Sequence, residues 1–145
     1  MKLSWLLWLA SMLPQPLADQ TCLATTVYLE ARSEPTLGQF AVAEVALRRR
    51  ERGRWGESVC AVVSAPRQFA ISTTPKGFEV ENMTAWNKAW GIAGRAMKMW
   101  QQPRDKRSVV VPLADHFVKL DEVSPAWAKG APLATIGEHS FFAVN

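Results

Sequence analysis

Histidine and cysteine are scarce in this sequence, which contains only His116, His139, Cys22 and Cys60. Zinc-dependent peptidases and amidases normally take three protein ligands from histidine, cysteine and carboxylate side chains. Carboxylates could complete such a set, but no metal-ligand motif is present, so we expect neither a metal site nor a cofactor. A serine-hydrolase motif, internal repeats and low-complexity tracts are also missing. These absences argue against metal-dependent and serine-dependent hydrolysis.

No apolar run reaches the roughly 20 residues that a comfortable transmembrane helix needs. The mostly apolar run of residues 3–13 follows Lys2 and precedes Pro16 and Ala18, an order typical of an export signal. We expect residues 1–18 to be a signal peptide cleaved after Ala18. Since Pro16 stands where a small residue is usual, the alternative is an uncleaved anchor that contacts the membrane transiently. Either way, the protein is predicted to act in the periplasm, in the cell wall or outside the cell.

The two cysteines lie in the predicted mature domain, residues 19–145. An even number of cysteines in an exported protein points to a disulfide between Cys22 and Cys60. Closing a loop of that length would stabilise the fold by about 4 kcal/mol in the chain-entropy model. The alternative is a pair of buried free thiols. The expected disulfide also disfavours either cysteine as a nucleophile.

The composition shows no strong excess of one charge. The 145 residues are 48% hydrophobic and 21% charged, which fits one globular domain, and the net charge is only +4. Five arginines gather between Arg48 and Arg54. They fit a solvated helix end, or attraction to anionic envelope polymers that high salt would weaken. Nucleic acid is not an expected partner of an exported protein, and we expect a monomer.

Hydrophobic periodicity predicts helices first and strands last. Helices are expected over 21–34, 36–47, 57–64 and 84–100. The last of these carries a stripe of tryptophans, which favours core packing over a sugar-stacking platform. Residues 67–83 predict a long loop with room for a short hairpin, and strands are expected at 109–111, 117–118 and 136–144. This order predicts an α+β domain, mostly helical and closed by a small antiparallel sheet.

An acidic residue interrupts the apolar face of the first predicted helix. At 100° per residue, Glu30 falls on the face formed by Leu23 and Val27, and Glu34 follows one turn later. A carboxylate there must be paired, solvated in a cleft, or kept protonated by desolvation, which raises its pKa. A raised pKa is what a general acid needs near neutral pH.

Two other interpretations of this acid stay open at the level of periodicity. Glu30 could form a structural ion pair with Arg32 or with one of the arginines at 48–50. Glu44, on the apolar side of the second predicted helix, could be the functional acid or another paired one. Spacing alone does not choose among these possibilities.

The segment from Glu30 to Ala43, EARSEPTLGQFAVA, resembles the opening signature of the SleB-type cell-wall hydrolases, a family of spore-cortex-lytic enzymes and relatives from bacteria and phages. Later segments resemble further family blocks in the same order: Val59–Val63, Gln68-Phe69, His116-Phe117, Ser124–Trp127 and Ile136–Phe141. The likeness spans about residues 22 to 142. The order and spacing of the blocks make it more specific than any one block.

The resemblance implies a lysozyme-like or transglycosylase-like fold and cleavage of peptidoglycan glycan strands between N-acetylmuramic acid and N-acetylglucosamine. It implies that Glu30 is the catalytic acid, and it favours a lytic transglycosylase, which needs no second carboxylate. The residues expected to contact substrate are Glu34, Gln39, Gln68, Phe69, Asp115, His116 and Trp127. Glu34 has the alternative of a supporting role behind the contacts.

The sequence departs from the family pattern at three places. Ser33 stands where glycine is usual, Arg48 where asparagine is common, and Asp115 where threonine often precedes the histidine. These changes leave the acid block intact. Two alternative functions remain at this stage: an amidase that cuts the lactyl–peptide bond, and a non-catalytic envelope module that binds glycan through aromatic and basic residues.

Overall fold

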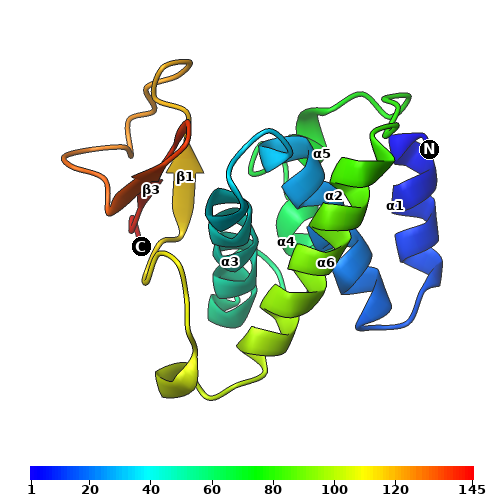
Figure 1. Cartoon of the computed structure of the whole chain (residues 1–145), viewed down its shortest axis with the longest axis horizontal. Coiled ribbons are helices and arrows are strands. Elements are labelled where there is room, and N and C mark those ends of the chain that lie inside the picture. Colours follow the sequence, from blue (N-terminus) through cyan, green and yellow to red (C-terminus); the bar gives the residue numbers. More distant parts are fainter.

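The computed structural model describes residues 1–145 as a body of helices with a small sheet at one side (Figure 1). The helices are α1 (Leu3–Met12), α2 (Leu17–Ala31), α3 (Thr36–Arg52), α4 (Val59–Ser64), α5 (Ala70–Thr73) and α6 (Met83–Trp100), followed by a 3-10 turn, η1 (Arg104–Lys106). The strands are β1 (His116–Val118), β2 (Ala134–Ile136) and β3 (His139–Phe142). The predicted α+β class, mostly helical with a small antiparallel sheet, is confirmed.

Helix α2 is the centre of the body and packs against α1, α3, α4 and α6. Leu23 and Val27 are fully buried, as their spacing predicts. The helix begins at Leu17, four residues before the expected start, and Thr21 lies inside it and is not its N-cap. The Thr21 hydroxyl instead donates to the carbonyl oxygen of Leu17 at 2.8 Å, inside the helix. Helix α2 ends at Ala31, one turn before Pro35.

Helix α3 starts at Thr36 as predicted and is buried through most of its length. It continues through the arginine run to Arg52, beyond the expected end. Gly53 ends it with φ of 74°, a left-handed conformation that glycine adopts without strain, and its N–H donates to the carbonyls of Arg49 and Arg50.

Helix α6 carries the tryptophan stripe into the core. Trp86 and Trp100 are buried and Trp90 is partly buried against them, which confirms packing rather than an open platform. The helix is capped by Asn82, whose side-chain oxygen accepts the N–H of Ala85 at 3.0 Å. The loop before it contains the short helix α5, so the expected hairpin within 67–83 is wrong.

The sheet has the order β1-β3-β2, and both pairs are antiparallel. Phe117 faces Phe141 across the first pair. The strand expected at 109–111 is wrong, because the backbone N–H groups of Val110 and Val111 are bound by a side chain instead of a neighbouring strand. The Glu44 carboxylate accepts both of them, at 2.9 Å and 3.4 Å.

Residues 1–18, predicted to be an export segment, contain α1, the link at 13–16 and the first two residues of α2. Leu3, Leu6 and Ala10 are buried in the same core as α2, whereas Trp5 and Trp8 are 71% and 64% exposed. Figure 1 shows α1 at the opposite side of the body from the sheet. None of the helices has both the length and the apolar character needed to cross a membrane. Cleavage after Ala18 stays a prediction.

The predicted disulfide is present and joins α2 to α4. Cys22 and Cys60 are bonded, with their Cα atoms 5.2 Å apart. The carboxylate of Asp19 lies beside this link and accepts the N–H of Val59 at 3.1 Å, at the start of α4. The bond therefore fixes the short α4 against the central helix.

Candidate active site

Glu30 lies in the last turn of α2, where the chain is about to leave the helical body. Its side chain is half-buried, and its Oε2 atom accepts the backbone N–H of Ala70 at 3.1 Å. Ala70 is the first residue of α5. The short helix in the otherwise irregular segment 67–83 thus fixes the orientation of the carboxyl group.

The Glu30 side chain faces a cavity of about 270 Å³ that we call the glutamate cavity. Its walls come from α2, the segment before α5, strands β1 and β3, and the loop that follows β1. The lining residues are Leu29, Glu30, Gln68, Phe117, Val118, Lys119, Glu122, Val123 and His139. The cavity therefore lies where the helical body meets the sheet.

Burial in this cavity wall raises the pKa of Glu30 above its ordinary value. The N–H of Ala70 and the positive charges of Lys119 and Arg49 favour the ionised form, but they do not outweigh the loss of hydration. The protonated carboxyl is thus available at a higher pH than for an exposed glutamate. Such a group can donate a proton to a ligand in the cavity.

No basic side chain forms an ion pair with Glu30, although the sequence left that possibility open. Arg32 donates to the carbonyl of Tyr28, Arg48 donates to the carbonyl of Ala114, and Arg50 pairs with Asp19 at 3.6 Å. Arg49, whose charge favours ionised Glu30, donates instead to the carbonyl of Asp115 and to Gln68. The structural-pair interpretation of Glu30 is therefore wrong.

Glu44, the other candidate acid, is buried away from the glutamate cavity. Its pKa is also raised by burial, against the N–H groups of Val110 and Val111 and the charge of Arg48. Because those N–H groups occupy both carboxylate oxygens, the geometry assigns Glu44 to holding the 109–111 segment.

A family model described as cell wall hydrolase matches residues 33–142, most of the chain. The chain belongs to the cell wall hydrolase family. Glu30 lies just before the matched range, so its assignment rests on the cavity and on the geometry around the carboxyl group.

Two solved structures resemble this cell wall hydrolase. One is the catalytic domain of the germination-specific lytic transglycosylase SleB from Bacillus anthracis, with a TM-score of 0.70 and 26% identity over 90% of this chain and 99% of that chain. The other is the catalytic domain of the SleB protein from Bacillus cereus, with a TM-score of 0.64 and 26% identity over 86% and 88% of the two chains. No curated protein sequence matches significantly.

Among the residues predicted to contact the substrate of this cell wall hydrolase, Gln68 lines the glutamate cavity together with Glu30. Its side-chain oxygen accepts a hydrogen bond from Arg49 at 3.0 Å. The Arg49 guanidinium lies over the ring of Phe69, 5.0 Å from its centroid. Burial lowers the pKa of Arg49 to about 10, despite the nearby carboxylates of Asp115 and Glu30. One buried arginine thus contacts both residues. Gln68 is exposed, whereas Phe69 is 3% exposed and belongs to the core, which contradicts the predicted substrate contact of Phe69.

His116 and Trp127 lie together at the start of the sheet, with ring centroids 4.7 Å apart. The Nδ1 atom of His116 is 2.9 Å from the carboxylate of Asp115, which fixes the ring. Burial lowers the pKa of His116, although Asp115 opposes this. Both rings are half-buried, so each presents a partly exposed edge.

Three other residues predicted to contact the substrate, Asp115, Glu34 and Gln39, are buried. Asp115 is 0% exposed, and its carboxylate accepts hydrogen bonds from Arg52 at 2.7 Å and from the N–H of Val144 at 2.7 Å. Gln39 is 2% exposed and donates to the carbonyl of Glu34 at 3.1 Å. The sequence predicted substrate contact for all three and support as an alternative only for Glu34. Their burial contradicts direct contact by Asp115 and Gln39 and agrees with the supporting role of Glu34.

Glu34 ties the α2–α3 turn to the β2–β3 hairpin. Its carboxylate accepts the N–H of Glu138 at 2.9 Å and lies 3.2 Å from Nδ1 of His139, without hydrogen-bond geometry. Gly137 has φ of 57°, and a Cβ atom there would be 2.9 Å from the carboxylate. The tight hairpin fits only because residue 137 has no side chain.

Lys119, Glu122 and His139 line the glutamate cavity, but none of them is among the contact residues predicted from the sequence. Lys119 pairs with Glu138 at 3.5 Å. Lys119 and Glu122 follow β1 in a loop without periodicity, so no pattern in the sequence marked them. His139 lies within a segment that resembles a family block, and that position was the available signal.

Proposed function

We propose that this cell wall hydrolase is an exported enzyme that cleaves peptidoglycan between N-acetylmuramic acid and N-acetylglucosamine as a lytic transglycosylase. The observation that carries the proposal is Glu30, a carboxyl group with a raised pKa, no ion-pair partner and an open cavity in front of it. Family membership and the resemblance to the B. anthracis lytic transglycosylase support it.

In the first step, Glu30 donates its proton to the glycosidic oxygen as the bond to C1 of the muramoyl sugar breaks. Positive charge develops on that sugar ring, and the glutamate becomes a carboxylate. The ammonium group of Lys119 and the N–H of Ala70 favour this ionised form, so they stabilise the enzyme at the point where the proton has left.

In the second step, the 6-hydroxyl oxygen of the muramoyl sugar bonds to C1 of the same sugar, and the Glu30 carboxylate accepts the proton of that hydroxyl. The product is a 1,6-anhydro sugar, and the glutamate regains the proton that it gave away. One acid thus serves both steps. Glu122 is the other carboxylate in the cavity wall, but its side chain is exposed on the loop after β1.

Gln68, His116 and Trp127 are proposed to contact the glycan, with Asp115, Glu34 and Gln39 holding them or the nearby backbone in place. Phe69, which lies in the core, is proposed as a support for Arg49 and Gln68. The half-buried ring of Trp127 suits packing against a sugar, and His116 beside it offers a ring nitrogen to a sugar hydroxyl. Gln68 offers an amide to a sugar hydroxyl.

Export and membrane contact are also part of the proposal, because residues 1–18 have the order of an export signal. The exposed face of α1, which includes Trp5 and Trp8, suits a transient stay in the interfacial region of a bilayer. The protein is proposed to act as a monomer.

Mass spectrometry of the soluble products from purified sacculi tests the reaction. We expect muropeptides that end in 1,6-anhydro-muramic acid and are lighter by one water than hydrolysis products. Reducing muramoyl ends would contradict the attack by the 6-hydroxyl while leaving Glu30 as a glycosidase acid. Free stem peptides with intact glycan strands would overturn the proposal in favour of an amidase.

A further inference from the structure

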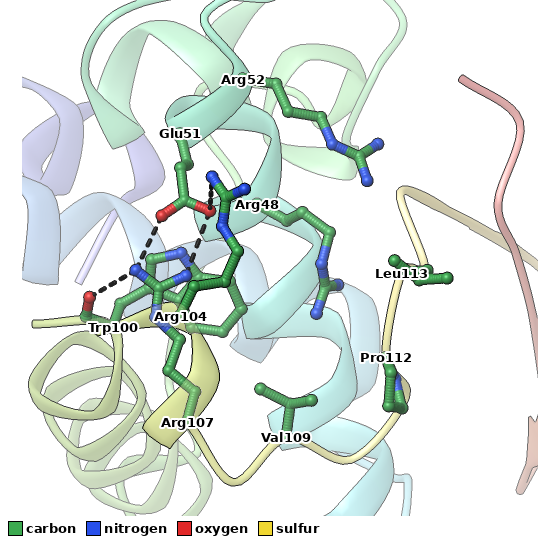
Figure 2. Close-up of a pocket in the computed structure, with 9 residues that line it drawn as sticks. All are labelled: Arg48, Glu51, Arg52, Trp100, Arg104, Arg107, Val109, Pro112 and Leu113. Carbon is green, nitrogen blue, oxygen red and sulfur yellow. Dashed lines mark hydrogen bonds and ion pairs between the residues drawn. The ribbon is translucent and has the colours of Figure 1, made fainter. Parts of the chain in front are cut away.

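A second cavity, which we call the arginine pocket, lies outside the glutamate cavity and shares no lining residue with it. It has a volume of about 260 Å³ and is bounded by the end of α3, the end of α6, η1 and the segment that leads to β1. Four arginines line it: Arg48, Arg52, Arg104 and Arg107 (Figure 2).

Only part of this positive charge is neutralised within the protein. Glu51, the single acidic residue of the lining, binds Arg107 through both carboxylate oxygens, at 3.1 Å and 2.7 Å, and lies 3.4 Å from Arg104. Arg52 pairs with the buried Asp115 at 2.7 Å. Four guanidinium groups therefore meet two carboxylates, and Arg48 forms no ion pair.

Arg48 is the group that needs an explanation. It is 7% exposed, and its one hydrogen bond runs to the carbonyl of Ala114. Figure 2 shows its guanidinium pointing into the middle of the pocket, toward Val109 and Leu113. The charge of Glu44, one turn earlier on α3, favours the Arg48 cation, but the Glu44 carboxylate accepts the N–H groups of Val110 and Val111 and forms no ion pair with Arg48. Burying a charge without an ion-pair partner is costly, so buried cations normally have one. The pocket provides space for an anion beside Arg48.

Trp100 contributes an aromatic ring to the same walls. Its indole Nε1 is buried and has no hydrogen-bond partner. The ring lies between two guanidinium groups, 4.6 Å from Arg107 and 5.2 Å from Arg48. The lining thus offers donors in excess of acceptors, which is the composition of an anion site.

Cations at the C-terminal end of a helix are stabilised by its dipole, which accounts for arginines in the last turn of α3. The same effect applies at the end of α6, where Arg107 donates to the carbonyl of Trp100 at 2.9 Å. It does not explain why Arg104 and Arg107 converge with the arginines of α3 on one pocket. Nor does it account for Arg48, which lies one turn before the helix end and turns inward.

We propose that the arginine pocket binds the phosphate group of a phosphate ester. Guanidinium groups recognise oxyanions through paired hydrogen bonds. A tetrahedral phosphate presents oxygens to arginines on several sides, whereas a carboxylate presents two oxygens in one plane. Val109 and Leu113, at the rim, give the organic part of the ester an apolar contact. This inference goes beyond the proposed function and does not depend on it.

Titration of the full chain with glycerol phosphate and with inorganic phosphate, at constant ionic strength in sodium chloride, tests the proposal. The readout is the indole N–H resonance of Trp100 in a ¹H–¹⁵N spectrum, with the indole of the exposed Trp8 as internal control. We expect saturable shifts of Trp100 with both probes, with tighter binding of the ester, and none of Trp8. Absence of a saturable Trp100 shift would overturn the proposal, as would equal shifts of both indoles.

Four variants sharpen this test. Arg48→Met is expected to weaken binding about tenfold, and Arg104→Ala, at an 81% exposed side chain that folding does not require, about threefold. Glu51→Gln removes the competing carboxylate and should tighten binding severalfold, the opposite direction. Lys88→Ala, an equal loss of charge at an exposed site on α6, should leave the dissociation constant unchanged. If Arg104→Ala and Glu51→Gln both bind like the parent, the pocket is not the site.

Discussion

Replacing Glu30 with glutamine is expected to lower the rate of sacculus clearing at least a hundredfold, because the amide can neither donate the proton to the glycosidic oxygen nor accept one afterwards. The substitution keeps the size of the side chain and its ability to accept the N–H of Ala70. We therefore expect a folded protein with an unchanged thermal midpoint. Turbidity of a purified murein suspension and the unfolding curve measure the two quantities.

Two further variants are needed to interpret this result: one is a control, and the other tests whether a second acid is required. Glu57→Gln, at an exposed residue before α4, should clear sacculi as fast as the parent. Glu122→Gln tests the single-acid mechanism, because Glu122 is the second carboxylate of the cavity wall. A moderate loss in Glu122→Gln fits a binding contribution. A loss as large as that of Glu30→Gln would indicate a two-carboxylate hydrolase.

Replacing Asp115 with alanine is expected to lower the free energy of unfolding by about 3 kcal/mol. For a domain of this size such a loss lowers Tm by roughly 10 °C. The Asp115 carboxylate is fully buried and accepts hydrogen bonds from Arg52, His116 and the backbone N–H of Val144 and Asn145. The alanine leaves these donors without their acceptor. Thermal and urea unfolding measure the effect.

The pH dependence distinguishes loss of this carboxylate from loss of packing. Burial opposes the ionisation of Asp115, but the N–H groups of Val144, His116 and Asn145 outweigh it and hold the pKa below its ordinary value of 3.8. The stabilisation is therefore complete above that value and is lost as the pH falls through the lower folded-state pKa. The gap between parent and Asp115→Ala should shrink below about pH 4. Asp121→Ala, at an exposed residue, should show no such gap.

The position of Glu30 was predictable because it depends on local geometry. Helical spacing puts it on the same face as Leu23 and Val27, and the structure confirms that this face is buried. Spacing could not show whether the carboxylate has a partner, because that depends on Ala70, which approaches from forty residues away. The resemblance to the cell-wall hydrolases favoured Glu30 as the catalytic acid, a choice that periodicity alone left open.

Two predictions, the strand at 109–111 and the contact of Asp115 with the glycan, are wrong for the same reason. In each case a carboxylate side chain binds backbone N–H groups that are distant in the sequence. The valine run at 109–111 has the composition of a strand, but the Glu44 carboxylate accepts its N–H groups, so they do not pair with another strand. Asp115 was expected near the glycan, but it binds Val144 and Asn145 at the far end of the sequence. Such long-range pairings leave no period in the sequence.

The most direct test of the account is a titration of the Glu30 carboxyl group itself. In protein labelled with ¹³C at the glutamate side chains, the Glu30→Gln spectrum identifies the resonance, and its chemical shift is followed against pH. We expect a midpoint clearly above the ordinary glutamate value of 4.5, since burial dominates its surroundings. A midpoint at or below 4.5 would mean that Glu30 is ionised throughout the working range, and it would contradict its role as the proton donor.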